Sequence, residues 1–175
     1  MRALLFSCLF LFIGLQGCIN YTPPLSGPTA KLRFVTLPGN KTQIKTLDEP
    51  RCDSGPGVTI ATLGEALRNE TGQGRSVDMP LADSVSKSSS SEINVRSGQA
   101  FAAQIKVGAG RGPSGAAWVY GACSKRFVLT PKEGVNYEAQ LEQYNGGCTL
   151  NVFRLSHEAG TYVRRLAGKE VTHCR

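Results

Sequence analysis

Apolar and polar residues alternate along much of this chain with a period of two. The clearest segment is 135–142, in which four apolar positions are each followed by a polar residue: Val135, Tyr137, Ala139 and Leu141. An α-helix repeats every 3.6 residues and could not place these four on one face, whereas a strand places every second residue on the same side. The segment is therefore predicted to be a strand with one buried face.

The same alternation, or a short β-branched run, predicts further strands. They are expected within residues 32–36, 58–60, 93–95, 101–107, 127–129, 149–155 and 161–166. Only 60–69 carries a helical pattern, and Gly64 weakens it, so at most one or two turns of helix are expected there. Eight or nine short strands predict an all-β fold, a single antiparallel β-sandwich of immunoglobulin-like or transthyretin-like kind. A partly open barrel is the alternative.

Two turn signals set the expected order of the strands in the C-terminal half. Residues 131–134 (Pro-Lys-Glu-Gly) and 145–147 (Asn-Gly-Gly) have compositions typical of tight turns. With a strand on either side of each turn, they predict a three-stranded meander over about residues 123–155. A fourth strand is expected at 161–166, after a turn at 157–160.

The first residues follow a different pattern. Arg2 precedes a charge-free run that ends at Leu15, and small residues follow, as in a secretory signal peptide. The run is shorter than the roughly 20 apolar residues that a membrane-spanning helix requires. The sequence Leu15-Gln16-Gly17-Cys18 resembles the lipobox of bacterial lipoprotein precursors. This resemblance implies export, cleavage before Cys18, and acyl chains on that cysteine.

The lipobox also implies a location and a division of the chain. Acyl chains on Cys18 would hold the protein on a membrane, because each buried methylene contributes about 0.8 kcal/mol. Ile19 stands where an Asp signals inner-membrane retention in enterobacterial lipoproteins, so the implied location in the cell envelope is the outer rather than the inner membrane. The expected organisation is a signal peptide at 1–17, a lipidated cysteine and Pro-rich spacer at 18–29, and a sandwich domain at 30–175.

Four of the six cysteines are available for disulfides, because Cys8 lies in the signal peptide and Cys18 takes the lipid. The four are Cys52, Cys123, Cys148 and Cys174. In an oxidising compartment they are expected to form two bridges, and a zinc site is disfavoured because no close C-x-x-C pair occurs. The expected meander would separate Cys123 from Cys148 by roughly 9.6 Å, beyond the usual disulfide Cα spacing of about 4.4 to 6.8 Å. The preferred pairing, one of three possible, is therefore Cys52 with Cys123 and Cys148 with Cys174.

The segment between two of these cysteines is similar to a loose group of uncharacterised proteobacterial lipoproteins. The shared order is a cysteine (Cys123), a strand at Phe127, a Pro-x-x-Gly turn at 131–134, a strand containing Tyr137, and a second cysteine (Cys148). This resemblance implies an all-β fold and an envelope location. It implies no activity.

Candidate catalytic chemistry is sparse. A nucleophile needs a nearby base, most often histidine, and the chain offers only His157 and His173. Ser156, His157 and Glu158 are adjacent in the sequence, but neighbours along a strand point in opposite directions. We therefore expect no catalytic, cofactor-binding or metal-binding residues, and a protein that is not an enzyme and uses no cofactor.

The charge is moderately basic. The chain carries 20 Lys and Arg against 13 Asp and Glu, a net charge of +7, and removal of the 17-residue signal leaves 158 residues with +6. Such a charge favours acidic partners at the envelope, and no nucleic-acid-binding motif is present. The leading hypothesis is a lipid-anchored envelope lipoprotein with a non-enzymatic binding or structural role. Its expected partners are the membrane, through Cys18, and an envelope protein or anionic envelope component. An inhibitor of a periplasmic or incoming hydrolase and an enzyme acting on envelope polymers are the alternatives.

Overall fold

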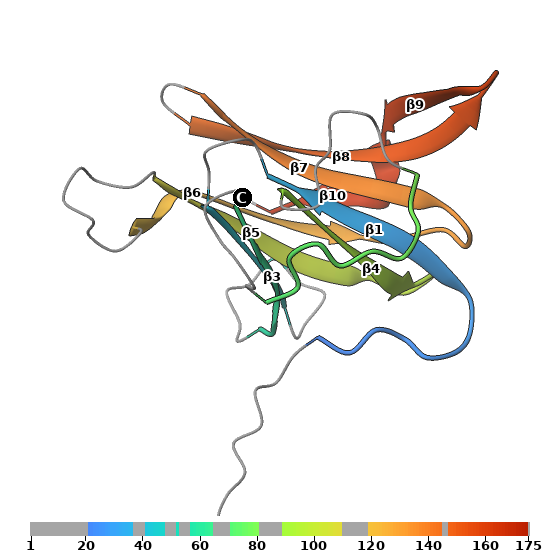
Figure 1. Ribbon diagram of the computed structural model, residues 1–175, viewed down its shortest axis with the longest axis horizontal. Coiled ribbons are helices and arrows are strands. Elements are labelled where there is room, and N and C mark those ends of the chain that lie inside the picture. Colours follow the sequence, from blue (N-terminus) through green and yellow to red (C-terminus); the bar gives the residue numbers. More distant parts are fainter. Residues whose placement is uncertain are drawn as a thin grey trace, which may run out of the picture.

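The computed structural model describes residues 21–36, 41–47, 52, 57–64, 71–80, 89–109, 119–144 and 147–174. Ten strands in these residues form two five-stranded sheets packed in two layers (Figure 1). The first sheet has the order β4 (Ser90–Arg96), β1 (Thr29–Val35), β7 (Asn136–Tyr144), β8 (Gly147–Glu158), β9 (Thr161–Leu166). The second has the order β10 (Val171–His173), β6 (Val119–Leu129), β5 (Phe101–Ala109), β2 (Lys41–Thr46), β3 (Thr59–Leu63). A 3₁₀ turn, η2 (Gly168–Glu170), lies between β9 and β10.

The expected fold class, an all-β sandwich with two disulfides, is confirmed. Neighbouring strands are antiparallel except for β1 and β7, which pair in parallel. Two of the ten strands, β2 and β10, were not expected. β2 has the sequence KTQIKT, with a single apolar residue, so hydrophobic alternation could not reveal it.

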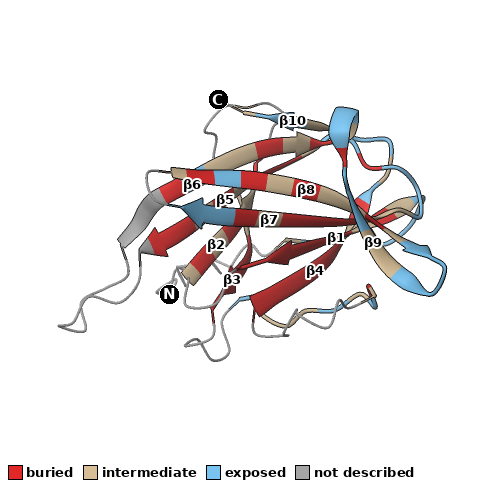
Figure 2. Ribbon diagram, turned by 90° about the horizontal axis from the view of Figure 1, so that it is seen from above, coloured by how far each residue is buried: buried red, intermediate tan, exposed pale blue. Residues whose placement is uncertain are grey.

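The core lies between the two sheets, on the faces that the alternation predicts (Figure 2). Leu32 and Phe34 of β1 are buried there, as are Tyr137, Ala139 and Leu141 of β7. Burying a side chain the size of Leu or Phe stabilises a fold by about 1.5 to 3 kcal/mol. The strand expected at 135–142 is thus confirmed as β7, and its burial holds the first sheet against the second.

The expected meander over residues 123–155 is wrong. The turn at 131–134 carries the chain from the second sheet to the first, so β6 and β7 lie in opposite layers. Gly134 has a φ of +70° in this turn, which glycine adopts readily, and its N–H donates to the Thr29 carbonyl at 2.9 Å. A turn signal marks a change of direction but does not say whether the two flanking strands pair. The three-stranded meander of this half of the chain consists instead of β7, β8 and β9.

The helix expected within 60–69 is also wrong for the first residues of that segment. Residues 60–63 belong to β3, which pairs with β2, and Ile60, Ala61 and Leu63 are fully buried. Residues 65–70 lie outside the described part of the chain. Tertiary pairing has therefore overridden a weak local preference in this segment.

The Pro-rich segment before β1 runs without helix or strand, as expected, but its first described residue contacts the domain. The Tyr21 hydroxyl donates to the Asn94 carbonyl at 2.8 Å, and its ring meets Phe101 edge-on at 6.3 Å between centroids. Tyr21 thereby holds this segment against β4 and β5. Residues 18–20, which include Cys18, lie outside the described part.

Candidate functional site

The two disulfides are Cys52–Cys174 and Cys123–Cys148, with Cα atoms 5.1 and 6.1 Å apart. The preferred pairing of Cys52 with Cys123 and of Cys148 with Cys174 is wrong. It rested on placing Cys123 and Cys148 two strands apart in one sheet. Because β6 and β8 instead belong to opposite sheets, Cys123 and Cys148 face one another across the sandwich, within bridging distance.

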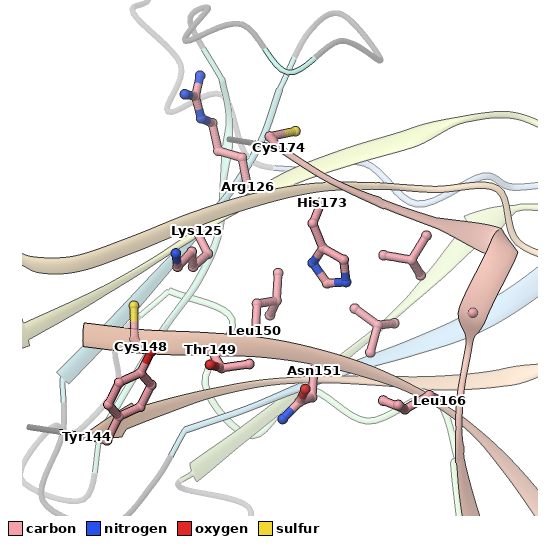
Figure 3. Close-up of a pocket in the computed structure, with 13 residues that line it drawn as sticks. Lys125, Arg126, Tyr144, Cys148, Thr149, Leu150, Asn151, Leu166, His173 and Cys174 are labelled. Atoms are coloured by element: carbon pink, nitrogen blue, oxygen red, sulfur yellow. The ribbon is translucent and has the colours of Figure 1, made fainter. Parts of the chain in front are cut away.

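A groove opens along this same side of the sandwich, between β8 on one wall and β6 with β10 on the other (Figure 3). We call it the seam groove. Its volume is about 610 Å³, which lies within the range of small-molecule and peptide sites. Its lining comprises Lys125, Arg126, Tyr144, Cys148, Thr149, Leu150, Asn151, Val152, Leu166, Gly168, Val171, His173 and Cys174.

The path of the C-terminal segment creates the groove. After β9 the chain leaves the first sheet, passes through η2 and joins the second sheet as β10. The Ala167 N–H donates to the Val152 carbonyl at 2.8 Å on one side of this crossover, and the Cys174 N–H donates to the Arg126 carbonyl at 3.0 Å on the other. The crossover therefore bounds one end of the groove, and the bridge between Cys123 and Cys148 bounds the other.

Backbone hydrogen-bonding groups face the groove from both walls. Alternate residues of a strand direct their N–H and C=O groups to the same edge. The Val152 carbonyl accepts from Ala167, so the backbone groups of Leu150 and Cys148, on the same edge of β8, face the groove. β9 does not cover them, because it pairs with β8 only from Phe153 onward. On β6, the Arg126 carbonyl accepts from Cys174 at the end of β10. By the same alternation the backbone N–H and C=O of Ser124 point to this edge of β6, past the last residue that β10 covers. No residue in the described part of the chain bonds to these edge groups.

The described residues that line the groove carry positive charge and no carboxylate. Lys125 lies on the inward face of β6, opposite Ile105 in the ladder, and it forms no ion pair with any described residue. His173 of β10 points across the groove toward β8, whereas the Arg126 side chain points away from it (Figure 3). An occupant of the groove would therefore meet one cation and one imidazole.

A second polar cluster is buried on the outer face of the first sheet. Glu92, Arg33 and Glu138 stand side by side on β4, β1 and β7, and the Arg33 side chain has no exposed surface. Arg33 donates to Glu92 Oε1 from Nε at 2.9 Å and from Nη2 at 2.7 Å, and to Glu138 Oε2 from Nη1 at 3.3 Å. Its Nη2 also donates to the Pro80 carbonyl at 2.7 Å. Arg164 of β9 completes the row, 2.9 Å from Glu138 Oε1.

This cluster fastens the segment 71–80 over the sheet. Glu92 Oε2 accepts hydrogen bonds from the Val77 N–H at 2.8 Å, the Met79 N–H at 3.2 Å and the Ser76 hydroxyl at 3.0 Å. Burial alone would raise the pKa of Glu92, but these N–H donors and Arg33 outweigh it and hold the pKa below its usual value. The arrangement is that of a structural anchor, because every charge in it faces a partner.

A third cluster holds the crossover. The Tyr137 hydroxyl accepts from the Lys132 N–H at 3.0 Å and donates to Glu170 Oε2 at 2.6 Å. Burial, reinforced by this bond to Glu170, raises the pKa of Tyr137 to about 12. Glu170 also pairs with Lys132 at 2.9 Å and Arg154 at 3.4 Å. Because Glu170 belongs to η2, these contacts fix the end of the seam groove.

The three adjacent residues with a catalytic composition do not form a site. The Ser156 hydroxyl donates to Glu158 at 2.9 Å, while the His157 ring packs edge-on against Tyr162 at 5.2 Å between centroids. Ser156 and Glu158 share one face of β8 and His157 occupies the other, as the strand geometry requires. His173 lies in the seam groove, away from these three.

The described residues contain neither a metal-binding cluster nor a membrane-spanning helix. Within those ranges no cluster of three or more His, Cys, Asp or Glu is placed to hold a metal ion. Within the same ranges no helix has the length and hydropathy needed to cross a bilayer.

Sequence reasoning missed both Arg33 and Lys125. A signal for Lys125 was present, because Cys123, Phe127 and Leu129 alternate on the buried face of β6 and Lys125 interrupts them. Arg33 offered no such signal, since it occupies a polar position that reads as solvent-facing until segment 71–80 covers it.

No protein-family model matches this chain, and no curated protein is significantly similar to it.

Proposed function

We propose that this protein is a lipid-anchored lipoprotein of the cell envelope with a non-enzymatic binding role. In this proposal it is exported, cleaved before Cys18, and held by acyl chains at the outer rather than the inner membrane. The seam groove carries the binding role: it is a concave site of about 610 Å³ in which Lys125 and the backbone groups along the β8 edge have no partner among the described residues. Two disulfides suit an oxidising compartment.

Tethering would assist such a site. A module held at a membrane meets an envelope partner at a high local concentration, so a modest intrinsic affinity suffices. The Pro-rich spacer is docked at Tyr21, which would fix the short distance between the lipid and the sandwich. The clusters around Arg33 and Glu170 fasten segment 71–80 and η2 to the sandwich, and a preformed binding surface loses less conformational entropy on binding.

The test is complementation of a deletion strain with full-length variants. Cys18→Ala removes the acylation site, and Cys8→Ala is the matched control because Cys8 lies in the segment expected to be discarded. Wild type and Cys8→Ala should fractionate with membranes and restore the envelope defect of the strain. Cys18→Ala should do neither at equal abundance. Full restoration by Cys18→Ala would show that tethering has no part in the function.

A further inference from the structure

We propose that the occupant of the seam groove is an extended, acidic segment of a partner protein, which pairs with the free edge of β8 as an added strand. This inference rests on the binding role proposed above and names the partner's chemistry. Free strand edges with unpaired N–H and C=O groups are the usual sites of strand addition. Native proteins commonly cover or charge such edges, whereas this one borders a groove.

The length of the free edge sets the size of the segment. It extends from Cys148 to Val152, a span of roughly 13 Å at about 3.3 Å per residue. The crossover at one end and the Cys123–Cys148 bridge at the other limit it to that span. A strand of about four residues would therefore fill it, bonding to the N–H and C=O groups of Leu150 and Cys148.

The charge of the opposite wall selects an acidic segment. Side chains of an added strand alternate, so every second one would point inward toward β6 and β10. There they would meet Lys125 and His173, while none of the described lining residues is a carboxylate. Acidic side chains satisfy Lys125, and an apolar or basic set would leave it buried without a partner.

The spacing of these two groups predicts a motif. His173 pairs with Phe127 across the ladder, so it stands two residues along the wall from Lys125. Two residues of an extended chain cover about the same distance on the opposing strand. The segment is therefore expected to carry acidic residues at positions i and i+2, separated by one residue that faces outward.

The experiment is selection of random nine-residue peptides, displayed on phage, against the full mature protein in detergent micelles. Enriched sequences should contain the acid-x-acid pattern. In synthetic versions of these peptides, every second backbone amide should face β8. N-methylation of those amides should abolish binding, and N-methylation of the intervening amides should leave it unchanged. Charge reversal by Lys125→Glu should weaken binding about tenfold or more, and Lys125→Gln should weaken it less. Lys45→Glu, on the outer face of β2, is the control and should leave binding unchanged.

Several results would overturn the inference. They are the absence of any enriched sequence, enrichment indifferent to charge, or binding that survives Lys125→Glu. Charge-dependent binding that is insensitive to both N-methylation patterns would indicate an anion site without strand pairing. A concentration-dependent dimer lost in Lys125→Glu would identify a second copy of the chain as the occupant. If no peptide binds but complementation depends on Cys18, only the proposal of an acidic strand is refuted. If peptides bind but complementation does not depend on Cys18, only the proposal of a tethered role is refuted.

Discussion

Replacing Arg33 with Met should be among the most destabilising single changes on the outer face of the first sheet. Arg33 donates to two carboxylates and to the Pro80 carbonyl from a side chain with no exposed surface. Met conserves much of the volume but leaves Glu92 and Glu138 charged and buried without their shared cation. Breaking a buried ion pair by removing one partner costs about 3 to 5 kcal/mol. Glu92 keeps its N–H donors from segment 71–80, and Glu138 keeps Arg164, so this range is an upper bound.

Urea denaturation of the mature domain at neutral pH measures this cost. The midpoint should fall while the slope with denaturant stays constant. Arg96→Met is the matched control, because Arg96 is exposed on β4, and it should change stability by less than about 0.5 kcal/mol. Adding Glu92→Gln and Glu138→Gln to Arg33→Met should recover much of the loss, because the stranded charges are then gone. A cost under about 1 kcal/mol for Arg33→Met, or no recovery in the triple variant, would refute the argument from buried charge.

Four further predictions concern the bridges and the titrating groups. Peptide mapping without reduction should yield linked fragments containing Cys52–Cys174 and Cys123–Cys148, and a fragment linking Cys148 to Cys174 would contradict the fold. Tyr137→Phe should lower the free energy of unfolding by about 1.5 to 3 kcal/mol in the same denaturation assay, because a hydrogen bond to the charged Glu170 is lost. The pKa of Tyr137 is raised to about 12, so the contribution of this residue to the free energy of unfolding should be fully present below pH 10 and decline toward pH 12. In the folded protein the phenolate absorbance of Tyr137 should appear at a higher pH than in the unfolded chain. The pKa of Glu92 is lowered, so its contribution should be present above pH 4.5 and be lost as the pH falls through the lowered folded value. Glu92→Gln should flatten that part of the acid-unfolding curve.

Period-two alternation identified most strands because it reports which side chains face a core. It worked for β7, whose Tyr137, Ala139 and Leu141 face the second sheet, and it missed β2, where a single isoleucine faces inward. It could not assign strands to sheets, since β6 and β7 carry similar patterns in opposite layers. The error in disulfide pairing followed directly from that one assignment.

The candidate site was less predictable than the fold. Lys125 and His173 are 48 residues apart in sequence and line the same groove only because the chain crosses between sheets after β9. The buried row centred on Arg33 joins β4, β1 and β7 through one antiparallel and one parallel pairing. Neither pairing is encoded in local sequence, because register and direction depend on the whole fold.

Intact mass spectrometry of the mature protein, extracted from membranes with detergent, tests the proposed lipoprotein most directly. The mature chain should begin at Cys18, carry acyl chains on that residue, and lack the four hydrogens removed in forming two disulfides. A chain that begins at Met1, carries no lipid and has all six cysteines reduced would contradict the proposal.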